Sequence, residues 1–434
     1  MLEEKDAKTA TRTVRKAVNE PVQEVTADIC VVGAGMAGIS AALEAARLGR
    51  KVVLIDGLPM LGGQVVNSII GTFCGLFSDG PHFYQFTHGI ADDILRDLAA
   101  TGGLYYPEGR RDHKVPLYDE TALSRWIEKA VQAAGITVIL GGILRGVTSK
   151  ERRITTLEIA TRYGDVRIAA NGFVDATGDA ALTWQTGLPC RRLTGDVYGS
   201  HTAILDGIDV NNHPTRDELT ARQREKAKEY GLVRTDGIVF VFPARGTSVL
   251  NMTHVQTPLE PLAASAKALE GKDQIDLVVD FLRKEFPLAY GKARIRAYGL
   301  PGVRQTRWIV GRQQLTTADV FAGTHFSDAI GRTAWPIELH DKSEGYIWQP
   351  FAENHVHYIP LGALTPPDID NLVAAGRCID ADVDALSSVR VHGPCIATGM
   401  AAAHALDLAG TGSVHAIDIA VLQERLKDNL VRTD

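Results

Sequence analysis

The chain of 434 residues lacks several features that would place it in a common class of protein. Its five cysteines form no CxxC pair and no cluster with metal-ligand spacing, which excludes a structural zinc site and a redox-active cysteine pair. No apolar run approaches the roughly 18 residues that a membrane-spanning helix needs. Neither sign of charge dominates, because 46 Lys and Arg against 52 Asp and Glu give a net charge of −6. This balance gives no electrostatic reason to expect nucleic acid or an anionic membrane as a partner.

The N-terminus also lacks the pattern of a secretory signal. The segment MLEEKDAKTATRTVRKAVNE mixes charges of both signs and contains no apolar stretch. We predict a mobile arm over residues 1–24 and, from the cysteine pattern, a reduced cytoplasmic protein. The composition, 45% hydrophobic and 23% charged, is that of a soluble globular protein that is too long for one ordinary core.

The pattern of residues in the segment Ala27–Asp56 predicts a ligand-binding site. An apolar run of strand length leads into GAGMAG, an Ala/Leu-rich helical run, a glycine stop and a second apolar run that ends in Asp56. In such a unit Gly33 forms the tight turn, Gly35 lets the backbone approach a pyrophosphate, and Gly38 lets the helix pack closely on the sheet. The N–H groups at the helix N-terminus face the phosphates, and Asp56 is placed to accept hydrogen bonds from a ribose diol. We predict a dinucleotide site; the alternative is a glycine turn in an ordinary βαβ unit.

Other segments have the character of a cofactor region. The loop over residues 57–80 is rich in glycine and apolar residues, so we expect it to line a ligand. Residues 172–179 and 371–378 are short apolar strands that end in glycine turns. Two alternatives are open for Asp179: it caps the next helix, or it lies together with Gly178 close to the cofactor. Residues 390–399 lead into an Ala-rich helix that begins around a proline.

Periodicity predicts the elements between these segments. Residues 88–101 and 118–134 form amphipathic helices, the second of them capped by Asp119 or Thr121. Residues 137–140 form a buried strand.

Residues 146–170 alternate apolar and polar side chains as antiparallel strands do. After residue 187 the character of the chain changes: residues 238–256 indicate further sheet, and residues 258–286 a long helix with a charged outer face. No second GxGxxG follows, so a separate NAD(P)H domain is not expected. We predict a dinucleotide-binding domain made of residues 25–186 and 346–434, interrupted by a substrate domain over residues 187–345.

These pieces together resemble the FAD-dependent oxidoreductases whose cofactor domain is shared with glutathione reductase, succinate dehydrogenase and amine oxidases. More narrowly, the chain resembles a broad bacterial family of FAD-dependent oxidoreductases. The resemblance runs from about Ala27 to Leu408. It rests on GAGMAG with Asp56, LGGQ, FVDATGDAALTWQTGLP, GVRQTRWIVG, WPIELH and NLVAAGRCIDADVDALSSVRVHGPCIATGMAAAHA.

The resemblance implies an α/β fold in which a Rossmann-like FAD-binding domain of the glutathione-reductase type (ββα) carries an inserted α+β substrate domain. It implies FAD as the cofactor, with Asp56 at the ribose where relatives more often carry Glu. The helix start at residues 394–401 would lie against the isoalloxazine, where its dipole stabilises a reduced flavin. The residues placed at the cofactor are Gly33, Gly35, Met36, Ala37, Gly38, Asp56, Gly57, Gly62, Gly63, Gln64, Ala176, Thr177, Gly178, Asp179, Gly376, Arg377, Pro394, Cys395, Thr398, Gly399 and Met400. No metal is expected.

Four side chains are candidates for moving a proton during hydride transfer to the flavin. His392 is the first, because it directly precedes the predicted flavin helix; His340, His357 and Tyr358 are the others. Each histidine has the alternative of a hydrogen-bonded structural role. On a strand, His355 and His357 would share one face and act together.

Arg304, Arg307 and Arg390 are candidates for binding a carboxylate through a bidentate fork. The alternative is an ion pair with Glu338 or Asp341 that fixes the domain interface. Aromatic residues of the later part of the chain suggest either binding surfaces or core packing: Trp184, Trp308, Trp335, Trp348 and Tyr346.

Four hypotheses for function follow from this pattern. The first is a dehydrogenase or oxidase that moves hydride from a small hydroxylated or aminated metabolite to FAD. The second is a fumarate-reductase-like enzyme that reduces an activated alkene and depends on an external electron donor. A non-catalytic subunit and a simple NAD dehydrogenase are the third and fourth, and the cofactor segments at both ends of the chain count against both. The substrate, the electron acceptor, covalent attachment of FAD and the formation of a homo-oligomer stay open.

Overall fold

The computed structural model describes residues 11, 13–15, 22–80, 83–107 and 114–434. The arm predicted for residues 1–24 lies largely outside these residues, and Gln23 already belongs to the first strand. Within the described part of the chain, no helix is long and apolar enough to cross a membrane. The same residues contain no cluster of three or more His, Cys, Asp or Glu that could hold a metal ion.

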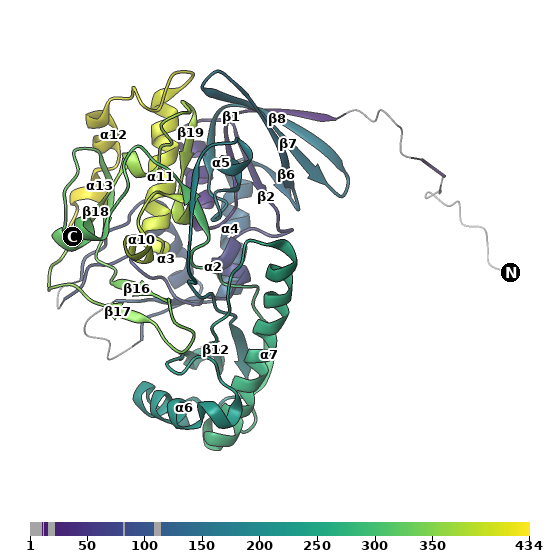
Figure 1. Cartoon of the computed structure of the whole chain (residues 1–434), viewed down its shortest axis with the longest axis vertical. Helices are drawn as coiled ribbons and strands as arrows, with labels where there is room; N and C mark the ends of the chain where they lie inside the picture. The colour runs from purple at the N-terminus through teal and green to yellow at the C-terminus, as the bar shows by residue number, and fades with distance from the viewer. Residues whose placement is uncertain (1–10, 12, 16–21, 81–82, 108–113) are drawn as a thin grey trace.

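A seven-stranded sheet forms the centre of the fold (Figure 1). Its strands are β1 (Gln23–Val32), β2 (Val52–Asp56), β5 (Thr137–Leu140), β6 (Ile143–Lys150), β7 (Arg153–Thr161), β8 (Gly164–Asp175) and β19 (Leu372–Ala374). β5, β2, β1, β8 and β19 run parallel, whereas β6 and β7 continue the sheet as an antiparallel meander. The strand predicted at residues 137–140 is therefore present, but its predicted burial is wrong. It pairs only with β2 at the sheet edge, so its side chains are exposed or half-buried.

The two faces of this sheet are covered by different layers. Side chains alternate along a strand, so the apolar runs of β1 and β2 supply both layers. One set packs with helices α1 (Met36–Arg47) and α11 (His392–Ala409): Ile29, Val31, Val52 and Leu54. The other set packs with the meander: Cys30, Val32, Val53 and Ile55. This arrangement, a parallel sheet between helices and a β-meander, is that of an FAD-binding Rossmann-like domain.

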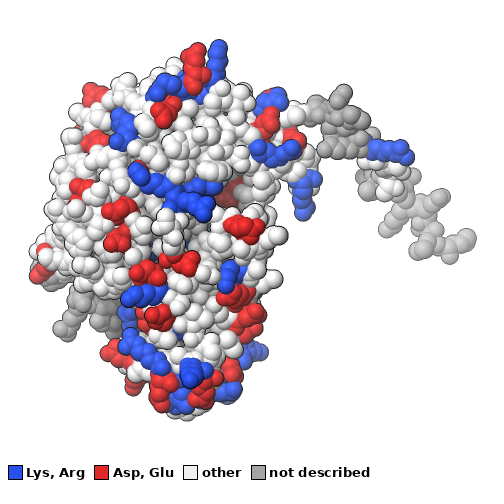
Figure 2. All heavy atoms as spheres, viewed as in Figure 1, with Lys and Arg blue, Asp and Glu red and all other residues white. Residues whose placement is uncertain are grey.

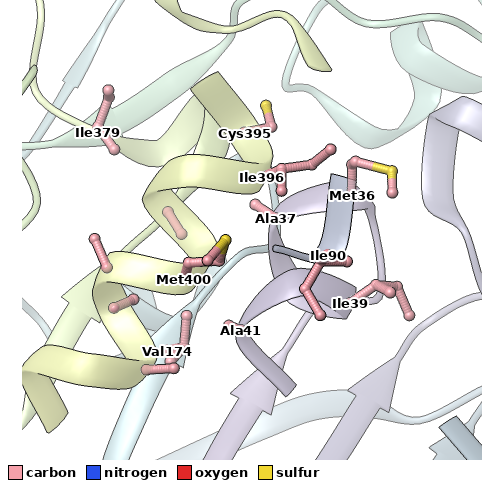
Figure 3. Packing of buried hydrophobic residues seen from close by; sticks show 14 of the residues in the cluster. Met36, Ala37, Ile39, Ala41, Ile90, Val174, Ile379, Cys395, Ile396 and Met400 are labelled. Atoms are coloured by element: carbon pink, nitrogen blue, oxygen red, sulfur yellow. The ribbon is translucent and has the colours of Figure 1, made fainter. Parts of the chain in front are cut away.

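Helices α1 and α11 pack very closely, although they lie far apart in the sequence. Figure 3 shows Ala37 and Ala41 of α1 beside Ile396 and Met400 of α11. A Cβ placed on Gly399 would lie 2.2 Å from the carbonyl oxygen of Ala37. Small residues at this contact thus bring the start of α11 to the start of α1, where the nucleotide motif lies.

A second, antiparallel sheet lies at one end of the molecule (Figure 1). Its order is β11 (Ile238–Phe242), β12 (Thr247–Asn251), β10 (Ala203–Asp206) and β13 (Arg294–Tyr298). Helices α6 (Arg216–Tyr230) and α7 (Pro261–Glu285) enclose a separate hydrophobic core with this sheet. The sheet predicted as far as residue 256 ends at Asn251, and beyond it only Val255 forms an isolated bridge.

The surface at this end carries both signs of charge (Figure 2). Helix α6 contributes many of these side chains and pairs them internally, as in Arg222–Glu225 and Lys226–Glu229. Such i,i+3 pairs explain how a helix with little apolar surface is stable at the surface.

The helix predicted over residues 118–134 is observed as α4 (Glu120–Ala133), and Asp119 caps it by accepting from the N–H groups of Thr121 and Ala122.

The remaining elements connect and cover the two sheets. These elements are α2 (Gly63–Asn67), α3 (Ile90–Ala100), β3 (Leu104–Tyr105), β4 (Leu117–Tyr118), α4 (Glu120–Ala133), α5 (Ala181–Gln185), β9 (Cys190–Arg192), η1 (Val210–Asn212), η2 (Pro243–Arg245), α8 (Pro287–Tyr290), β14 (Arg307–Ile309), α9 (Thr317–Ala322), β15 (Ala329–Thr333), β16 (Ile337–Leu339), β17 (Ile347–Gln349), β18 (His357–Pro360), η3 (Leu361–Ala363), η4 (Gly376–Cys378), α10 (Val383–Val389), α12 (Ile419–Arg425) and α13 (Lys427–Val431).

We expect Gly271→Ala to destabilise the second sheet. A Cβ at this position in α7 would lie 1.9 Å from Nδ1 of His201, whose ring is buried. Overpacking of this kind costs about 1–3 kcal/mol, which outweighs the gain of about 1 kcal/mol in helix propensity. Urea unfolding should give a lower midpoint for this variant. Gly195→Ala is the control, because a Cβ there meets nothing within 4 Å; equal stability of the two variants would contradict the expectation.

Candidate cofactor and active site

One cavity of about 1180 Å³ runs from the glycine motif to the second sheet. It is larger than the 300–1,000 Å³ typical of a pocket for one small ligand. Fourteen of the predicted cofactor residues line it: Gly33, Gly35, Met36, Ala37, Asp56, Gly63, Gln64, Ala176, Thr177, Gly178, Asp179, Gly376, Arg377 and Cys395. The other seven predicted cofactor residues are not part of the lining: Gly38, Gly57, Gly62, Pro394, Thr398, Gly399 and Met400. The cavity therefore has room for a dinucleotide and a second ligand.

The three glycines of GAGMAG have the conformations that their predicted roles require. Gly33 has a φ of 100°, which favours glycine, and a Cβ there would lie 2.3 Å from the carbonyl oxygen of Ala176. A Cβ on Gly38 would lie 1.8 Å from the carbonyl oxygen of Gly33. A Cβ on Gly35, by contrast, meets no protein atom within 4 Å. The open space at the start of α1 leaves room for the pyrophosphate of a dinucleotide, so these residues fit the cofactor.

Asp56 joins the end of β2 to the glycine turn. Its carboxylate accepts hydrogen bonds from the N–H groups of Ala34, at 2.6 Å, and Leu58, at 2.7 Å. Burial raises the pKa of Asp56, and the two backbone donors act in the opposite direction. The residue also lines the cavity, which fits its predicted place beside a ribose.

A buried carboxylate holds the turn after β8. Asp175 accepts hydrogen bonds from the N–H and hydroxyl groups of both Thr177 and Thr183, at 2.7–3.2 Å. Gly178, at the tip of this turn, has a φ of 80° and lines the cavity. The dense bonding fixes the backbone of the turn against the cofactor space. Sequence reasoning placed the segment Asp175–Asp179 beside the cofactor but did not predict this role of Asp175, although a single acid within an apolar strand is a recognisable signal.

Of the two alternatives for Asp179, the helix cap is not observed. The N-cap of α5 is Ala180, in a left-handed conformation with no side-chain bond. Asp179 instead accepts from the hydroxyl of Thr306 at 2.5 Å and lies 3.6 Å from a guanidinium nitrogen of Arg377. Its carboxylate thus links the turn after β8 to η4, across the cavity lining.

The start of α11 faces the same cavity. Thr398 lies behind the lining, where its hydroxyl accepts a hydrogen bond from the N–H of Gly376 at 3.0 Å. This bond positions the Gly376–Arg377 turn on the helix. Nη1 of Arg377 is buried and makes no hydrogen bond, and the carboxylate of Asp179 lies 3.6 Å from it as an ion-pair partner.

His392 is the first residue of α11 and lines the cavity, as predicted. Its Nδ1 accepts a hydrogen bond from the backbone N–H of Cys74 at 3.3 Å. The neutral ring therefore carries its hydrogen on Nε2 and is a donor there. Burial, helped by the charge of Arg390, lowers the pKa of His392 to about 4. The ring is thus uncharged at neutral pH.

His340 lies behind the cavity wall and is not part of the lining. Its Nε2 lies 3.1 Å from Oε1 of Glu338, and its Nδ1 lies 2.9 Å from Nε2 of His254. Tyr346 stacks on its ring at 4.8 Å. Of this group, Glu338 and Tyr346 line the cavity, and sequence reasoning named Glu338 only as an ion-pair partner.

Two of the three candidate arginines face the cavity. Arg304 donates to the carbonyl oxygen of Tyr198 at 2.6 Å and to the hydroxyl of Ser200 at 3.0 Å. Arg390 donates to the carbonyl oxygen of Glu338 at 3.1 Å. Arg307 lies outside the lining, on β14, where it binds the carbonyl oxygen of Asp179.

The candidate aromatic residues also divide into those that line the cavity and those that do not. Trp335, Trp348 and Tyr346 line the cavity. Trp308 is buried in the core, and Trp184 is exposed beneath the guanidinium of Arg307.

His357 and Tyr358 lie outside the lining. The prediction of a shared face assumed that His355 and His357 lie on one strand, but β18 begins at His357 and does not include His355. Nδ1 of His357 nevertheless lies 3.2 Å from Nε2 of His355, and Nε2 of His357 contacts the hydroxyl of Ser388. The five cysteines are free thiols.

Comparison with known proteins finds distant relatives. The chain is 23% identical over 350 residues to the small chain of glutamate synthase [NADPH] from Azospirillum brasilense, covering 75% of this chain and 67% of that protein. It is 25% identical over 224 residues to mitochondrial dihydrolipoyl dehydrogenase from Rattus norvegicus, covering 50% of this chain but only 37% of the relative. A solved structure of a geranylgeranyl bacteriochlorophyll reductase-like protein from Thermoplasma acidophilum matches 94% of this chain and 86% of its own, with 14% identity and a TM-score of 0.47.

A family model extends over most of the chain. The model described as FAD dependent oxidoreductase matches residues 28–426, from the middle of β1 to the end of α12. This range contains the glycine motif, the turn after β8 and the start of α11 that together line the cavity. The chain belongs to the FAD-dependent oxidoreductase family, and its cofactor is FAD.

Proposed function

We propose that the protein oxidises a small hydroxylated or aminated metabolite by transferring a hydride to FAD. The observation that supports this proposal is the single cavity that joins the nucleotide motif, the start of α11 and the second sheet. FAD, when bound, supplies a flavin ring that accepts a hydride and later passes the electrons to an acceptor. The residues of this chain bind the cofactor, exclude water and hold the substrate.

Each part of the cavity has a role in this proposal. The backbone of Gly33–Gly38 binds the pyrophosphate, and Asp56 binds the ribose. The N-terminal dipole of α11 stabilises negative charge at the isoalloxazine. Residues 187–345, which contain the second sheet, form the substrate domain.

His392 orients the substrate in this proposal. Because Cys74 donates to Nδ1, the ring presents Nε2–H to the cavity side of the site. A donor at this position holds the oxygen or nitrogen next to the carbon that loses the hydride. The role differs from the proton acceptor expected from the sequence, since the ring would have to change tautomer to accept a proton at Nε2.

A second candidate is the reduction of an activated alkene with an external electron donor. The observation that favours it is the number of cationic or N–H donors in the lining: Arg304, Arg390 and His392. Such donors stabilise the negative charge that develops when hydride adds to an alkene next to a carbonyl group.

Anaerobic titration of the purified flavoprotein separates the two candidates. The visible absorption of the flavin is followed while hydroxy acids, amino acids, amines, polyols and NAD(P)H are added in turn. Bleaching by a hydroxylated or aminated compound is the expected result. Bleaching by NAD(P)H alone, followed by reoxidation with an activated alkene, supports the reductase instead. A flavin that none of these compounds reduces or reoxidises contradicts both candidates.

A further inference from the structure

Four aromatic side chains from outside the cofactor segments line the cavity. Trp335 lies just before β16, Tyr346 directly precedes β17, and Trp348 lies within β17. Phe240 and Ile238 of β11 also line the cavity, and because they are two positions apart they share one face of the strand. We call the four aromatic side chains the aromatic wall: Phe240, Trp335, Tyr346 and Trp348.

Contacts between two distant segments hold this wall together. The β16–β17 hairpin is bound to the residues just before β11: the N–H and hydroxyl groups of Thr235 donate to the carbonyl oxygen of Glu344 at 2.8 and 3.0 Å. The N–H of Tyr346 donates to the carboxylate of Asp236 at 3.3 Å, and the guanidinium of Arg234 lies 5.3 Å from the centroid of the Tyr346 ring. The aromatic side chains of the hairpin and of β11 therefore line neighbouring parts of the cavity.

The rings of the hairpin are arranged at right angles to one another. The centroids of Trp335 and Trp348 lie 5.4 Å apart with an interplanar angle of 90°, and those of Tyr346 and Trp348 lie 6.3 Å apart at 86°. A flat ligand parallel to the indole of Trp348 would thus be nearly perpendicular to both other rings. Aromatic rings favour stacked and edge-to-face contacts at these distances, so this geometry suits a further aromatic ring.

The polar atoms of two of these rings are bound by other protein groups. The indole N–H of Trp335 donates to Oε2 of Glu338 at 3.0 Å. The hydroxyl of Tyr346 accepts a hydrogen bond from the guanidinium of Arg216 at 2.9 Å. These bonds fix the orientation of both rings, which therefore offer the cavity apolar faces and edges.

Two polar side chains of the lining near the second sheet are bound in the same way. The hydroxyl of Ser200 donates to the carbonyl oxygen of Thr253 at 3.0 Å. The side-chain oxygen of Asn251 accepts from the guanidinium of Arg234 at 3.1 Å. Their hydrogen bonds are thus made within the protein, and the aromatic wall is left as the surface that contacts the unreactive part of a ligand.

The aromatic wall extends to the residue proposed to hold the reacting group. Trp335 packs with Val391 in one hydrophobic cluster, and Val391 directly precedes His392 at the start of α11. All three residues line the cavity. A ligand that contacts both Trp335 and His392 thus has its ring close to the group that reacts.

We infer that the substrate carries an aromatic ring, which binds against the aromatic wall while His392 holds the hydroxyl or amino group next to the carbon that is oxidised. The inference rests on the proposed function, because both concern the same cavity. It adds the chemical class of the substrate: an alcohol or amine with an aromatic ring close to the reacting carbon. Aromatic contacts contribute to affinity beyond the apolar area that they bury, so an aromatic ring is preferred to an aliphatic ring of the same size.

Calorimetric titration of the oxidised flavoprotein tests this inference without turnover. The probes are benzamide and cyclohexanecarboxamide, which share an uncharged amide group and a six-membered ring but differ in aromaticity. Neither contains the alcohol or amine carbon that the proposed reaction oxidises, so the titration measures binding alone. Benzamide should bind at least about fivefold more tightly than cyclohexanecarboxamide, the effect of a single aromatic contact.

Substitution of Trp348 tests the place of the ring. Trp348→Leu removes the ring that contacts both Trp335 and Tyr346 but keeps an apolar side chain, so the preference for benzamide should fall about fivefold. Trp348→Phe retains an aromatic ring and should keep most of the preference. Trp184→Leu is the matched control, because Trp184 is 54% exposed and lies outside the lining. This control should keep the full preference.

The outcomes are distinguishable from those of the proposed function. Equal affinity of the wild-type protein for the two amides, or no measurable binding of either, overturns the inference, even if an alcohol or amine reduces the flavin. An unchanged preference in Trp348→Leu overturns the placement of the ring at the aromatic wall. Preferential binding of benzamide without reduction of the flavin by any alcohol or amine supports the inference and contradicts the proposed function. The wild-type comparison needs no variant, so a variant that does not fold cannot conceal the result.

Discussion

Replacing Gly35 by valine is expected to abolish FAD binding and to leave the apoprotein folded. Gly35 is the N-cap of α1, with a φ of −73°, a conformation that any residue adopts. A Cβ there meets no protein atom within 4 Å, so the fold provides space for a side chain. In the holoprotein that space is the path of the pyrophosphate past the helix N-terminus. We expect FAD affinity to fall by at least about 100-fold, equivalent to about 3 kcal/mol.

The measurement combines a binding assay with a stability assay. Quenching of FAD fluorescence gives the Kd of the apoprotein, and circular dichroism with urea unfolding gives its stability. Gly38→Ala is the matched comparison, because a Cβ there would lie 1.8 Å from the carbonyl oxygen of Gly33. This second variant should lose stability as well as FAD. Normal FAD affinity in Gly35→Val would mean that the pyrophosphate does not pass over Gly35.

The cofactor region could be predicted because its determinants are local. The turn at Gly33, the close packing at Gly38 and the acid at Asp56 all follow from one strand–turn–helix unit, and the observed distances agree with these roles. Short apolar runs likewise predicted the parallel strands of the first sheet, and the alternation over residues 146–170 predicted its antiparallel strands. Burial was harder to predict, since β5 has an apolar sequence but lies at the edge of the sheet.

The substrate end of the cavity depends on contacts between distant segments. Arg304 precedes β14, Glu338 lies on β16 and His392 begins α11, and only the folded chain brings these residues to one cavity. Sequence pattern selected the histidine at position 340 but not the carboxyl group that separates it from the cavity. Periodicity gives no information on which member of such a hydrogen-bonded group faces a ligand.

Stability should fall steeply as the pH is lowered from about 7 to 5, within the titration range of unfolded histidine. Burial is the first cause that lowers the pKa of four histidines: His201 and His392 to about 4, His357 to about 3, and His254 to about 2. Adjacent positive charges act in the same direction, from Lys272 on His201, Arg390 on His392, and Arg234 and Arg304 on His254.

The sign follows from proton binding in the two states. Below about pH 6.5 the unfolded chain protonates these histidines, whereas the folded chain keeps them neutral until its own lower pKa values are reached. The unfolded state therefore binds more protons, and stability is lost as the pH falls through this range. Each histidine contributes about 1.4 kcal/mol per pH unit once its unfolded form is protonated, or about 2 kcal/mol at pH 5. Four such groups remove several kcal/mol, a large part of the 5–15 kcal/mol of an ordinary protein.

Urea unfolding of the flavoprotein over this pH range measures the effect, with flavin release followed separately by fluorescence. His201→Leu provides the matched control. The ring of His201 is buried, and neither ring nitrogen has a hydrogen-bond partner. An apolar side chain should therefore keep or raise stability at pH 7. It should also reduce the pH dependence by about 1.4 kcal/mol per unit, the contribution of one proton. A flat stability profile between pH 7 and 5 would show that these rings gain access to solvent protons in the folded state, in conflict with the burial that holds His392 neutral at the cavity.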